Sequence, residues 1–313
     1  MSNTAKRLYR SLRERYKLRF HYPQQISLEF TTRCNLRCQL CGRTYILDQL
    51  ELVDMHHLEL VAEELKRIRQ PDLIMVVGLG EPLLHKHCDD YLYYLREMFP
   101  DSTLSLFTNG VTLDKHIHAS LETMDMVTVG VNISGRERYR QFTGSDQYNR
   151  VVENAKQLLT EREGATPIVR VQLLDIQQVQ EVKEAFFRQF KPYIQPTDRL
   201  NAVSLVNFAG LVDLTSYTLP SDPLAQSIKR YPCWQVWTNL FFSANGDVYP
   251  CCVGTPLLGE LRLGNLITTP NLQTILNNGE LDHIKTCMRH DDYHEFPRCH
   301  TCNVWKRFPN LFF

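Results

Sequence analysis

The sequence predicts an α/β fold, in which repeated strand–helix units form a parallel sheet and a small cysteine-rich region follows. Two observations support this prediction. Short apolar runs alternate with segments of helical periodicity from residue 25 to about residue 210, and such alternation is typical of a parallel sheet with right-handed crossovers. Nine of the ten cysteines then fall into three groups, at residues 34–41, 233–252 and 287–302.

The first region contains six predicted strands with helices between them. The run from Gln25 to Phe30 alternates apolar and polar residues, as a strand does, and Asp54 can cap a helix that ends before Pro71. Six units are fewer than the eight of a closed barrel, so the pattern fits an open sheet or an incomplete barrel, with ligands at the carboxyl ends of the strands. The strands are expected at residues 25–30, 73–77, 104–107, 127–133, 168–173 and 203–208, and the helices around 55–70, 91–99, 113–124, 151–159 and 182–190.

The alternation stops near Gly210, and a mixed stretch with three prolines follows. This stretch predicts a domain boundary, which divides the chain into residues 1–24, 25–215 and 216–313. In the last part, Asn245-Gly246 lies between two apolar runs and predicts a β-hairpin. This part is too small and too rich in cysteine to fold on its apolar core alone, so a metal is expected to stabilise it.

Charge and hydropathy exclude several classes of partner. The 35 basic and 35 acidic residues give a net charge of 0, which argues against nucleic acid or an acidic membrane as the main partner. Residues 1–24 are locally basic and are expected to form an amphipathic helix on the protein surface. The sequence lacks the apolar stretch of a signal peptide or a membrane span, so we expect a cytoplasmic protein whose cysteines do not form disulfides.

Cys34, Cys38 and Cys41 place three thiols within eight residues, directly after the first strand. Three thiolates held close together suit an iron-sulfur cluster, and they leave one iron without a protein ligand. Packing cysteines or part of a zinc site are the alternatives. A zinc ribbon needs a second cysteine pair roughly 15 to 20 residues away, and the sequence has none at that distance, which favours the cluster.

This Cys-x3-Cys-x2-Cys motif resembles that of the radical S-adenosylmethionine (SAM) enzymes. Gly78-Leu-Gly-Glu-Pro82 after the second strand is similar to the family's GGEP segment, and Thr108-Asn-Gly110 also fits its pattern. The resemblance implies an incomplete (βα)6 TIM-like barrel and a [4Fe-4S] cluster on the three cysteines, whose open iron binds SAM. It also implies that Glu81 contacts the SAM ammonium, that Gly78 and Gly80 line the same site, and that Asn132 lies near the ribose.

The sequence leaves the roles of three residues on the fourth and fifth expected strands undecided. Gly130 stands where many of the enzymes similar to this chain carry serine. Arg170 and Gln172 are polar residues in an otherwise apolar strand. They either face the barrel interior and bind SAM or substrate, or they point outward.

The C-terminal region carries a second set of four cysteines. Cys233 and Cys251 flank the predicted hairpin in a Cys-x12-Gly-x4-Cys pattern, and Cys299 and Cys302 form a close pair. Four thiolates suit either an iron-sulfur cluster or structural zinc. The pattern resembles the cluster-binding domain called SPASM and its shortened form, twitch. That resemblance implies one auxiliary [4Fe-4S] cluster on these four residues.

Three cysteines remain outside both sets. Cys252 is expected to serve in packing, whereas Cys88 is expected to begin a helix and is assigned no role. Because some relatives that invert a carbon centre return a hydrogen atom from a cysteine, Cys287 is a candidate catalytic residue for that role.

The resemblance implies a radical SAM oxidoreductase (a dehydrogenase) or an epimerase. The expected substrate is a small molecule such as a sugar or an aminocyclitol, since only about 24 residues precede the first strand. An electron donor such as flavodoxin or ferredoxin would supply the reducing electron. The alternatives are an enzyme that modifies a ribosomally made peptide and, from another class, a non-catalytic zinc-stabilised binding protein.

Overall fold

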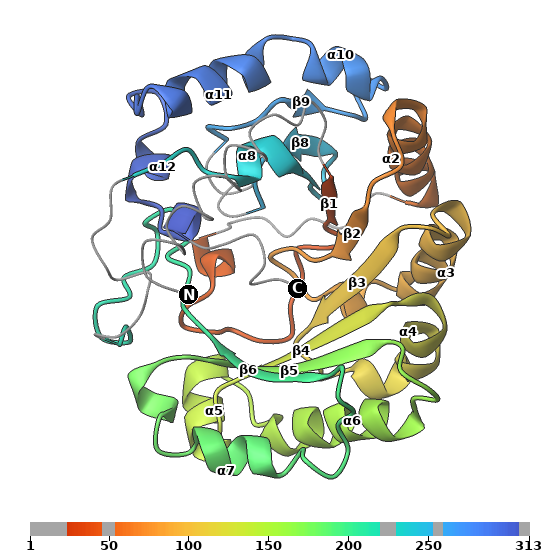
Figure 1. The fold of residues 1–313 in the computed structure, drawn as a ribbon, viewed down its shortest axis with the longest axis vertical. Coiled ribbons are helices and arrows are strands. Elements are labelled where there is room, and N and C mark those ends of the chain that lie inside the picture. Colours follow the sequence, from red (N-terminus) through yellow and green to blue (C-terminus); the bar gives the residue numbers. More distant parts are fainter. Residues whose placement is uncertain (1–23, 46–53, 220–229, 253–258, 307–313) are drawn as a thin grey trace.

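The computed structural model describes residues 24–45, 54–219, 230–252 and 259–306 (Figure 1). The predicted helix of the basic N-terminal segment, apart from Gln24, lies outside these residues. In the part of the chain that is described, no helix is long and apolar enough to cross a membrane.

Six parallel strands form the first part of the sheet in simple chain order, as predicted. The sheet curves from β1 to β6 and does not close (Figure 1), so it is an incomplete barrel. β1 to β6 span Gln25–Leu28, Leu73–Val76, Thr103–Thr108, Met126–Asn132, Ile168–Leu174 and Arg199–Val203.

Helices connect the strands and cover the outer, convex side of the sheet (Figure 1). Asp54 caps the first of these by accepting a hydrogen bond from the His57 amide at 3.0 Å, as predicted. The helices α2 to α7 span Met55–Ile68, Cys88–Met98, Ile117–Thr123, Arg136–Thr143, Tyr148–Glu161 and Lys183–Arg188. The 3₁₀ turns η1 to η4 span Gly42–Tyr45, Pro82–Leu84, Leu113–Lys115 and Gln177–Val179.

Two elements differ from the prediction. The sixth strand lies at Arg199–Val203 and not at residues 203–208. As an edge strand it pairs with β5 alone within this sheet and tolerates polar side chains, whereas the apolar run after it leaves the sheet and packs elsewhere. The second difference is α5, which the sequence analysis missed because its residues are mostly polar or charged. Gly135 and Gly144, both with positive φ, flank this helix and are the signal that marks its ends.

The C-terminal region continues the same sheet. β7 (Asn239–Phe242) pairs in parallel with β1, and β8 (Asp247–Tyr249) pairs antiparallel with β7, which confirms the predicted hairpin. β9 (Gly264–Asn265) forms the edge beyond β8. The remaining elements are α8 (Gln235–Thr238), α10 (Leu272–Leu276), α11 (Glu280–Arg289), α12 (Pro297–Thr301) and η5 (Val304–Lys306).

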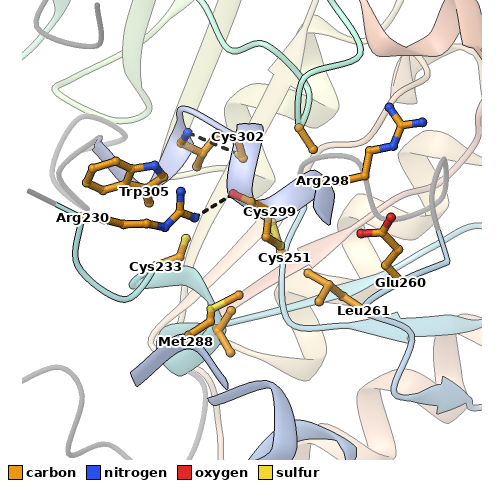
Figure 2. A pocket seen from close by; sticks show the side chains of 13 residues that line it. Arg230, Cys233, Cys251, Glu260, Leu261, Met288, Arg298, Cys299, Cys302 and Trp305 are labelled. Atoms are coloured by element: carbon orange, nitrogen blue, oxygen red, sulfur yellow. Dashed lines mark hydrogen bonds between the residues drawn. The ribbon is translucent and has the colours of Figure 1, made fainter. Parts of the chain in front are cut away.

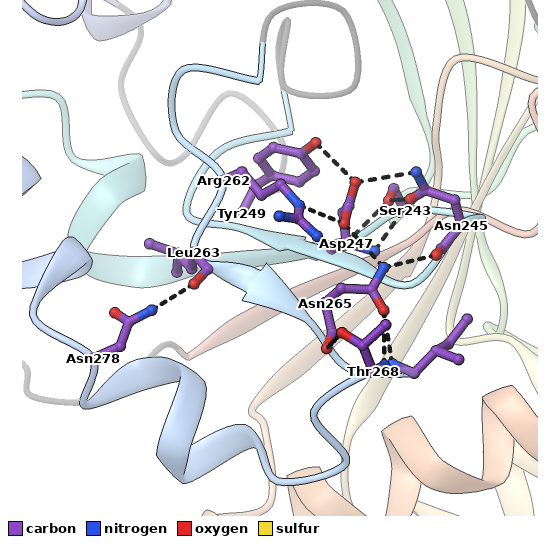
Figure 3. Close-up of polar contacts among 10 residues, drawn as sticks. Ser243, Asn245, Asp247, Tyr249, Arg262, Leu263, Asn265, Thr268 and Asn278 are labelled. Carbon is purple, nitrogen blue, oxygen red and sulfur yellow. Dashed lines mark hydrogen bonds and ion pairs between the residues drawn. The ribbon is translucent and has the colours of Figure 1, made fainter.

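A polar network fixes the turn of this hairpin (Figure 3). The Asp247 carboxylate accepts hydrogen bonds from Arg262 Nε at 2.6 Å and from Asn265 Nδ2 at 3.0 Å. Gly246 has a φ of +87°, and a Cβ there would lie 2.7 Å from the Ile267 side chain. The glycine between Cys233 and Cys251 is therefore required by both the backbone conformation and the packing.

Candidate functional site

A pocket of about 340 Å³ lies at the carboxyl ends of the strands. The predicted residues Gly78, Gly80, Glu81 and Asn132 all line it, together with Cys34 and Cys38. Residues far apart in the sequence thus meet at one place, where parallel α/β sheets bind their ligands. The other lining residues are Leu36, Val77, Phe107, Thr108, Asn109, Thr128, Gly130, Gln172 and Phe208.

The cysteine loop is held against the Gly78–Pro82 segment by backbone contacts. The Glu81 amide donates to the Arg33 carbonyl oxygen at 2.8 Å. A Cβ at Gly80 would collide with the Thr31 and Arg33 carbonyl oxygens, so the two segments approach this closely only because residue 80 is glycine. The position of Cys34 is therefore coupled to that of Glu81.

The Glu81 carboxylate is buried and held in place by hydrogen bonds, so it is not a solvated loop acid. It accepts hydrogen bonds from Thr108 Oγ1 at 2.6 Å, from the Asn109 amide at 2.6 Å and from the Leu83 amide at 3.3 Å. Burial outweighs these bonds and raises the pKa of Glu81 to about 7. A bound ammonium beside it would favour the ionised form, which suits the predicted contact with SAM.

The three thiols of the first loop form one group. The Cys38 thiol interacts electrostatically with both Cys34 and Cys41, and burial together with these neighbours raises the pKa of Cys38 to about 12. Asn109 Nδ2 donates to Cys34 Sγ at 3.7 Å, as an outer hydrogen bond to a cluster ligand would. Soft donors grouped in this way at the edge of an open pocket fit a cluster with one exchangeable coordination position.

The later strands supply amide side chains to the pocket. Asn132 has a φ of +65° and lies at a bulge between β4 and β5. A Cβ at Gly130 would lie 3.3 Å from Asn132 Oδ1, so a serine there would crowd this amide. Gln172 lines the pocket, and Arg170 lies two residues earlier on the same face of β5. The inward orientation is therefore confirmed for Gln172.

The sequence analysis missed Glu29, at the end of the first predicted strand. Its buried carboxylate accepts hydrogen bonds from the Leu79 amide at 2.8 Å and from the Ala244 amide at 3.2 Å. Glu29 therefore joins the glycine segment of the pocket to the C-terminal hairpin. Its place in an alternating apolar and polar run gave no sign of this role.

The second site gathers the four C-terminal cysteines around one small space (Figure 2). Cys233, Cys251, Cys299 and Cys302 all line a cavity of about 30 Å³, beside apolar residues that include Leu261 and Met288. Burial and the neighbouring thiols raise the pKa values of Cys233 and Cys299, the latter to about 12. Four thiols around so small a space fit a compact, fully protein-ligated cluster.

Arg230 is the residue of this site that the sequence analysis missed. Its guanidinium donates to the Cys299 carbonyl oxygen at 2.7 Å (Figure 2). It also lies over the rings of Tyr293, at 4.0 Å, and Trp305, at 5.0 Å. It therefore places a positive charge beside four cysteines. Arg230 lies in the mixed stretch between the two regions, where no motif marked it.

A short segment connects the two sites. Phe208 lines the first pocket and Ala209 lines the second. Phe208, Ala209 and Gly210 have φ values of +45°, +57° and +81°, a conformation that non-glycine residues rarely adopt. Thr301 Oγ1 donates to the Ala209 carbonyl oxygen at 3.1 Å, and Asn207 and Asn303 exchange two further hydrogen bonds.

The remaining cysteines lie outside both linings. Cys88 is the first residue of α3, as expected, and is buried in the core, while Cys252 Sγ donates to Gln235 Oε1 at 3.5 Å. Cys287 lies on α11, beside His283 and Glu295. Among the described residues it is not part of the lining of the Cys34 pocket.

Comparison with known proteins agrees with this geometry. A model of the Radical SAM superfamily matches residues 28–164, and a model of the iron-sulfur cluster-binding domain SPASM matches residues 233–303. A GTP 3',8-cyclase of Chlorobaculum tepidum is 28% identical over 156 residues, which are 47% of this chain and 43% of that protein. One of Corynebacterium glutamicum is 29% identical over 143 residues, 41% of this chain and 36% of that protein. The alignments thus span less than half of these relatives.

Solved structures share the fold along nearly the whole chain. BtrN, in complex with AdoMet and 2-DOIA, is 18% identical and has a TM-score of 0.61, with 91% of this chain and 94% of that chain covered. Streptococcus suis SuiB, bound to the precursor peptide SuiA, is 12% identical and has a TM-score of 0.67, with 98% and 76% covered. The chain therefore belongs to the Radical SAM superfamily and carries a C-terminal SPASM-type domain, and these two domains imply S-adenosylmethionine and [4Fe-4S] clusters as its cofactors.

Proposed function

We propose that this enzyme oxidises a polar small molecule, such as a sugar or an aminocyclitol, and that the four-cysteine site accepts the electron. The three-cysteine cluster and SAM, when bound, supply a 5′-deoxyadenosyl radical that removes one hydrogen atom from the substrate. Loss of a further electron and a proton completes the oxidation. A donor such as flavodoxin or ferredoxin provides the electron that cleaves SAM.

The observation that carries this proposal is the segment that joins the two linings. Because Phe208 and Ala209 are adjacent, a substrate against Phe208 lies within one residue of the lining of the second site. A fully thiolate-ligated cluster at this place is a suitable one-electron acceptor. Within the described lining of the first pocket, the thiols are Cys34 and Cys38, both cluster ligands, so no thiol there is left to return a hydrogen atom. This favours oxidation over epimerisation.

The polar lining of the first pocket supports a substrate rich in hydroxyl or amino groups. Asn132 and Gln172 present amides, which both donate and accept hydrogen bonds. BtrN, which matches this chain over most of both lengths, holds 2-DOIA. A peptide substrate is the second candidate, because SuiB, bound to its precursor peptide, matches 98% of this chain.

The test begins with anaerobic reconstitution, analysis of iron, sulfide and zinc, and an assay for 5′-deoxyadenosine. We expect about eight irons in the wild type and about four in Cys34→Ala/Cys38→Ala/Cys41→Ala, with SAM cleavage lost. Cys252→Ser, outside both sites, is the matched control.

Panels of aminocyclitols, sugars and peptides then identify the substrate, and an oxidised product must accompany 5′-deoxyadenosine. If neither iron nor SAM cleavage is found, the protein is not a radical SAM enzyme. A product that is inverted at a carbon centre but not oxidised would refute the role of the four-cysteine site as electron acceptor.

A further inference from the structure

Three potential metal ligands meet on the surface beside the four-cysteine site. His283 and Cys287 lie one turn apart on the same face of α11, and Glu295 reaches them from the segment before α12. The three ligand atoms all lie within 4.8 Å of one another. They are not ligands of either cysteine site described above.

The distances indicate which atoms would bind a metal. His283 Nε2 lies 3.1 Å from Glu295 Oε1 and 3.8 Å from Cys287 Sγ. Tetrahedral zinc, with bonds of about 2.0 to 2.3 Å, separates its ligand atoms by about 3.5 Å. The distances from His283 Nε2 to the other two ligand atoms therefore need to change by only a few tenths of an ångström for the group to hold zinc.

The chemistry of the group also favours zinc. Sulfur, imidazole nitrogen and carboxylate oxygen are the three donor types that zinc takes in proteins. A thiolate and a carboxylate together balance the two charges of the ion. The His283 ring lies against Phe296, with 6.1 Å between ring centres, which restricts the orientation of the imidazole.

We propose that His283, Cys287 and Glu295 form a zinc site with one position open to water. This assigns Cys287 a ligand role instead of that of a hydrogen-atom donor. The proposal uses the C-terminal fold and does not depend on which substrate the enzyme oxidises.

The zinc site lies next to residues of the four-cysteine site, and this indicates what bound zinc would do. Cys287 precedes Met288, which lines the four-cysteine site, and Glu295 precedes Phe296, whose carbonyl oxygen accepts from the Cys299 amide at 2.9 Å. Zinc would therefore tie α11 to the start of the helix that carries a cluster ligand. We expect bound zinc to slow the loss of the auxiliary cluster.

The experiment uses anaerobically reconstituted holoenzyme, in which the cluster cysteines are already occupied. After equilibrium dialysis against zinc, metal analysis is expected to find one zinc per wild-type chain beside the full iron content. Cys287→Ser should lose this zinc at unchanged iron, and His283→Gln or Glu295→Gln should bind roughly tenfold or more weakly. His290→Gln, directly after the same helix, and Cys252→Ser are matched controls that should retain it.

A second readout does not need the cysteine variant to fold. Zinc should protect Cys287 of the wild type from alkylation, as mapped by peptide mass, but should fail to protect it in His283→Gln. Zinc bound equally by Cys287→Ser, or iron found at the site in place of zinc, would overturn the proposal. So would alkylation of wild-type Cys287 at the same rate with and without zinc.

Discussion

The two cysteine sites of this enzyme differ in the space around their thiols. The three-cysteine site opens into a pocket of about 340 Å³ with amide and carboxylate groups, whereas the four-cysteine site surrounds about 30 Å³ with mostly apolar side chains and a few charged ones, among them Arg230. The first therefore has room for organic ligands that must enter and leave. The second has room for one compact group that stays, so the shape around the thiols, and not only their number, distinguishes the two sites and fits the different roles proposed for them.

The largest expected effect comes from single ligand changes in the two sites. Cys34→Ser should abolish SAM cleavage, because the cluster that binds SAM loses a ligand. Cys299→Ser should leave cleavage measurable and remove about four irons and the oxidised product. The assay measures 5′-deoxyadenosine and product in parallel. Equal loss of cleavage in both variants would contradict the division of roles.

The next effect tests the segment between the sites. A Cβ at Gly210, where φ is +81°, would collide with Thr301, so Gly210→Ala should move the segment that carries Phe208 and Ala209. We expect product formation to fall at least about tenfold while 5′-deoxyadenosine continues to form, because a shift of about 1 Å at a reacting centre is enough for such a loss.

Gly164→Ala is a matched control for this variant. Gly164 has a similar φ of +77°, but a Cβ there meets no atom within 4 Å among the described residues. It should cost about 1 kcal/mol in stability and leave both products unchanged. If Gly210→Ala retains normal coupling between cleavage and product, the segment does not position the substrate.

The sequence predicted the three-cysteine site better than the way in which the sites are joined. Cys34 follows the first strand of a repeated unit, Glu81 follows the second, and Asn132 ends the fourth, so the period of the chain brings them to one edge of the sheet. The residues that join the sites act through contacts with distant segments. Glu29 contacts Ala244, and Arg230 contacts Cys299. Phe208 is held in place by its neighbour Ala209, which contacts Thr301. Such contacts depend on the tertiary structure, which neither spacing nor periodicity encodes.

A smaller effect is expected from the positive charge beside the enclosed site. Arg230→Gln removes a cation from a thiolate-rich site and should lower the midpoint potential of the auxiliary cluster, on the order of tens of millivolts. SAM cleavage should continue while oxidation slows. Arg230→Lys retains the charge and should keep a potential near that of the wild type. A potential unchanged in Arg230→Gln would remove the electrostatic role of this residue.

The smallest effect concerns Glu29, which links the two regions through a buried carboxyl group. Burial raises the pKa of Glu29 to about 7 in the folded protein, from 4.5. The folded state therefore binds this proton more tightly than the unfolded state does, and the stabilisation, present below pH 4.5, is lost as the pH rises through 7. Glu29→Gln cannot ionise, so between pH 6 and pH 8 the variant should gain stability relative to the wild type by about 1 to 2 kcal/mol.

The measurement is the thermal unfolding midpoint of the anaerobic holoenzyme at pH 6 and at pH 8. Each kcal/mol of added stability should raise this midpoint by roughly 2 to 4 °C. Glu163→Gln, at an exposed position, should show no such relative gain. If the difference between Glu29→Gln and the wild type is the same at both pH values, the Glu29 carboxyl group does not titrate in this range, and its two backbone hydrogen bonds outweigh its burial.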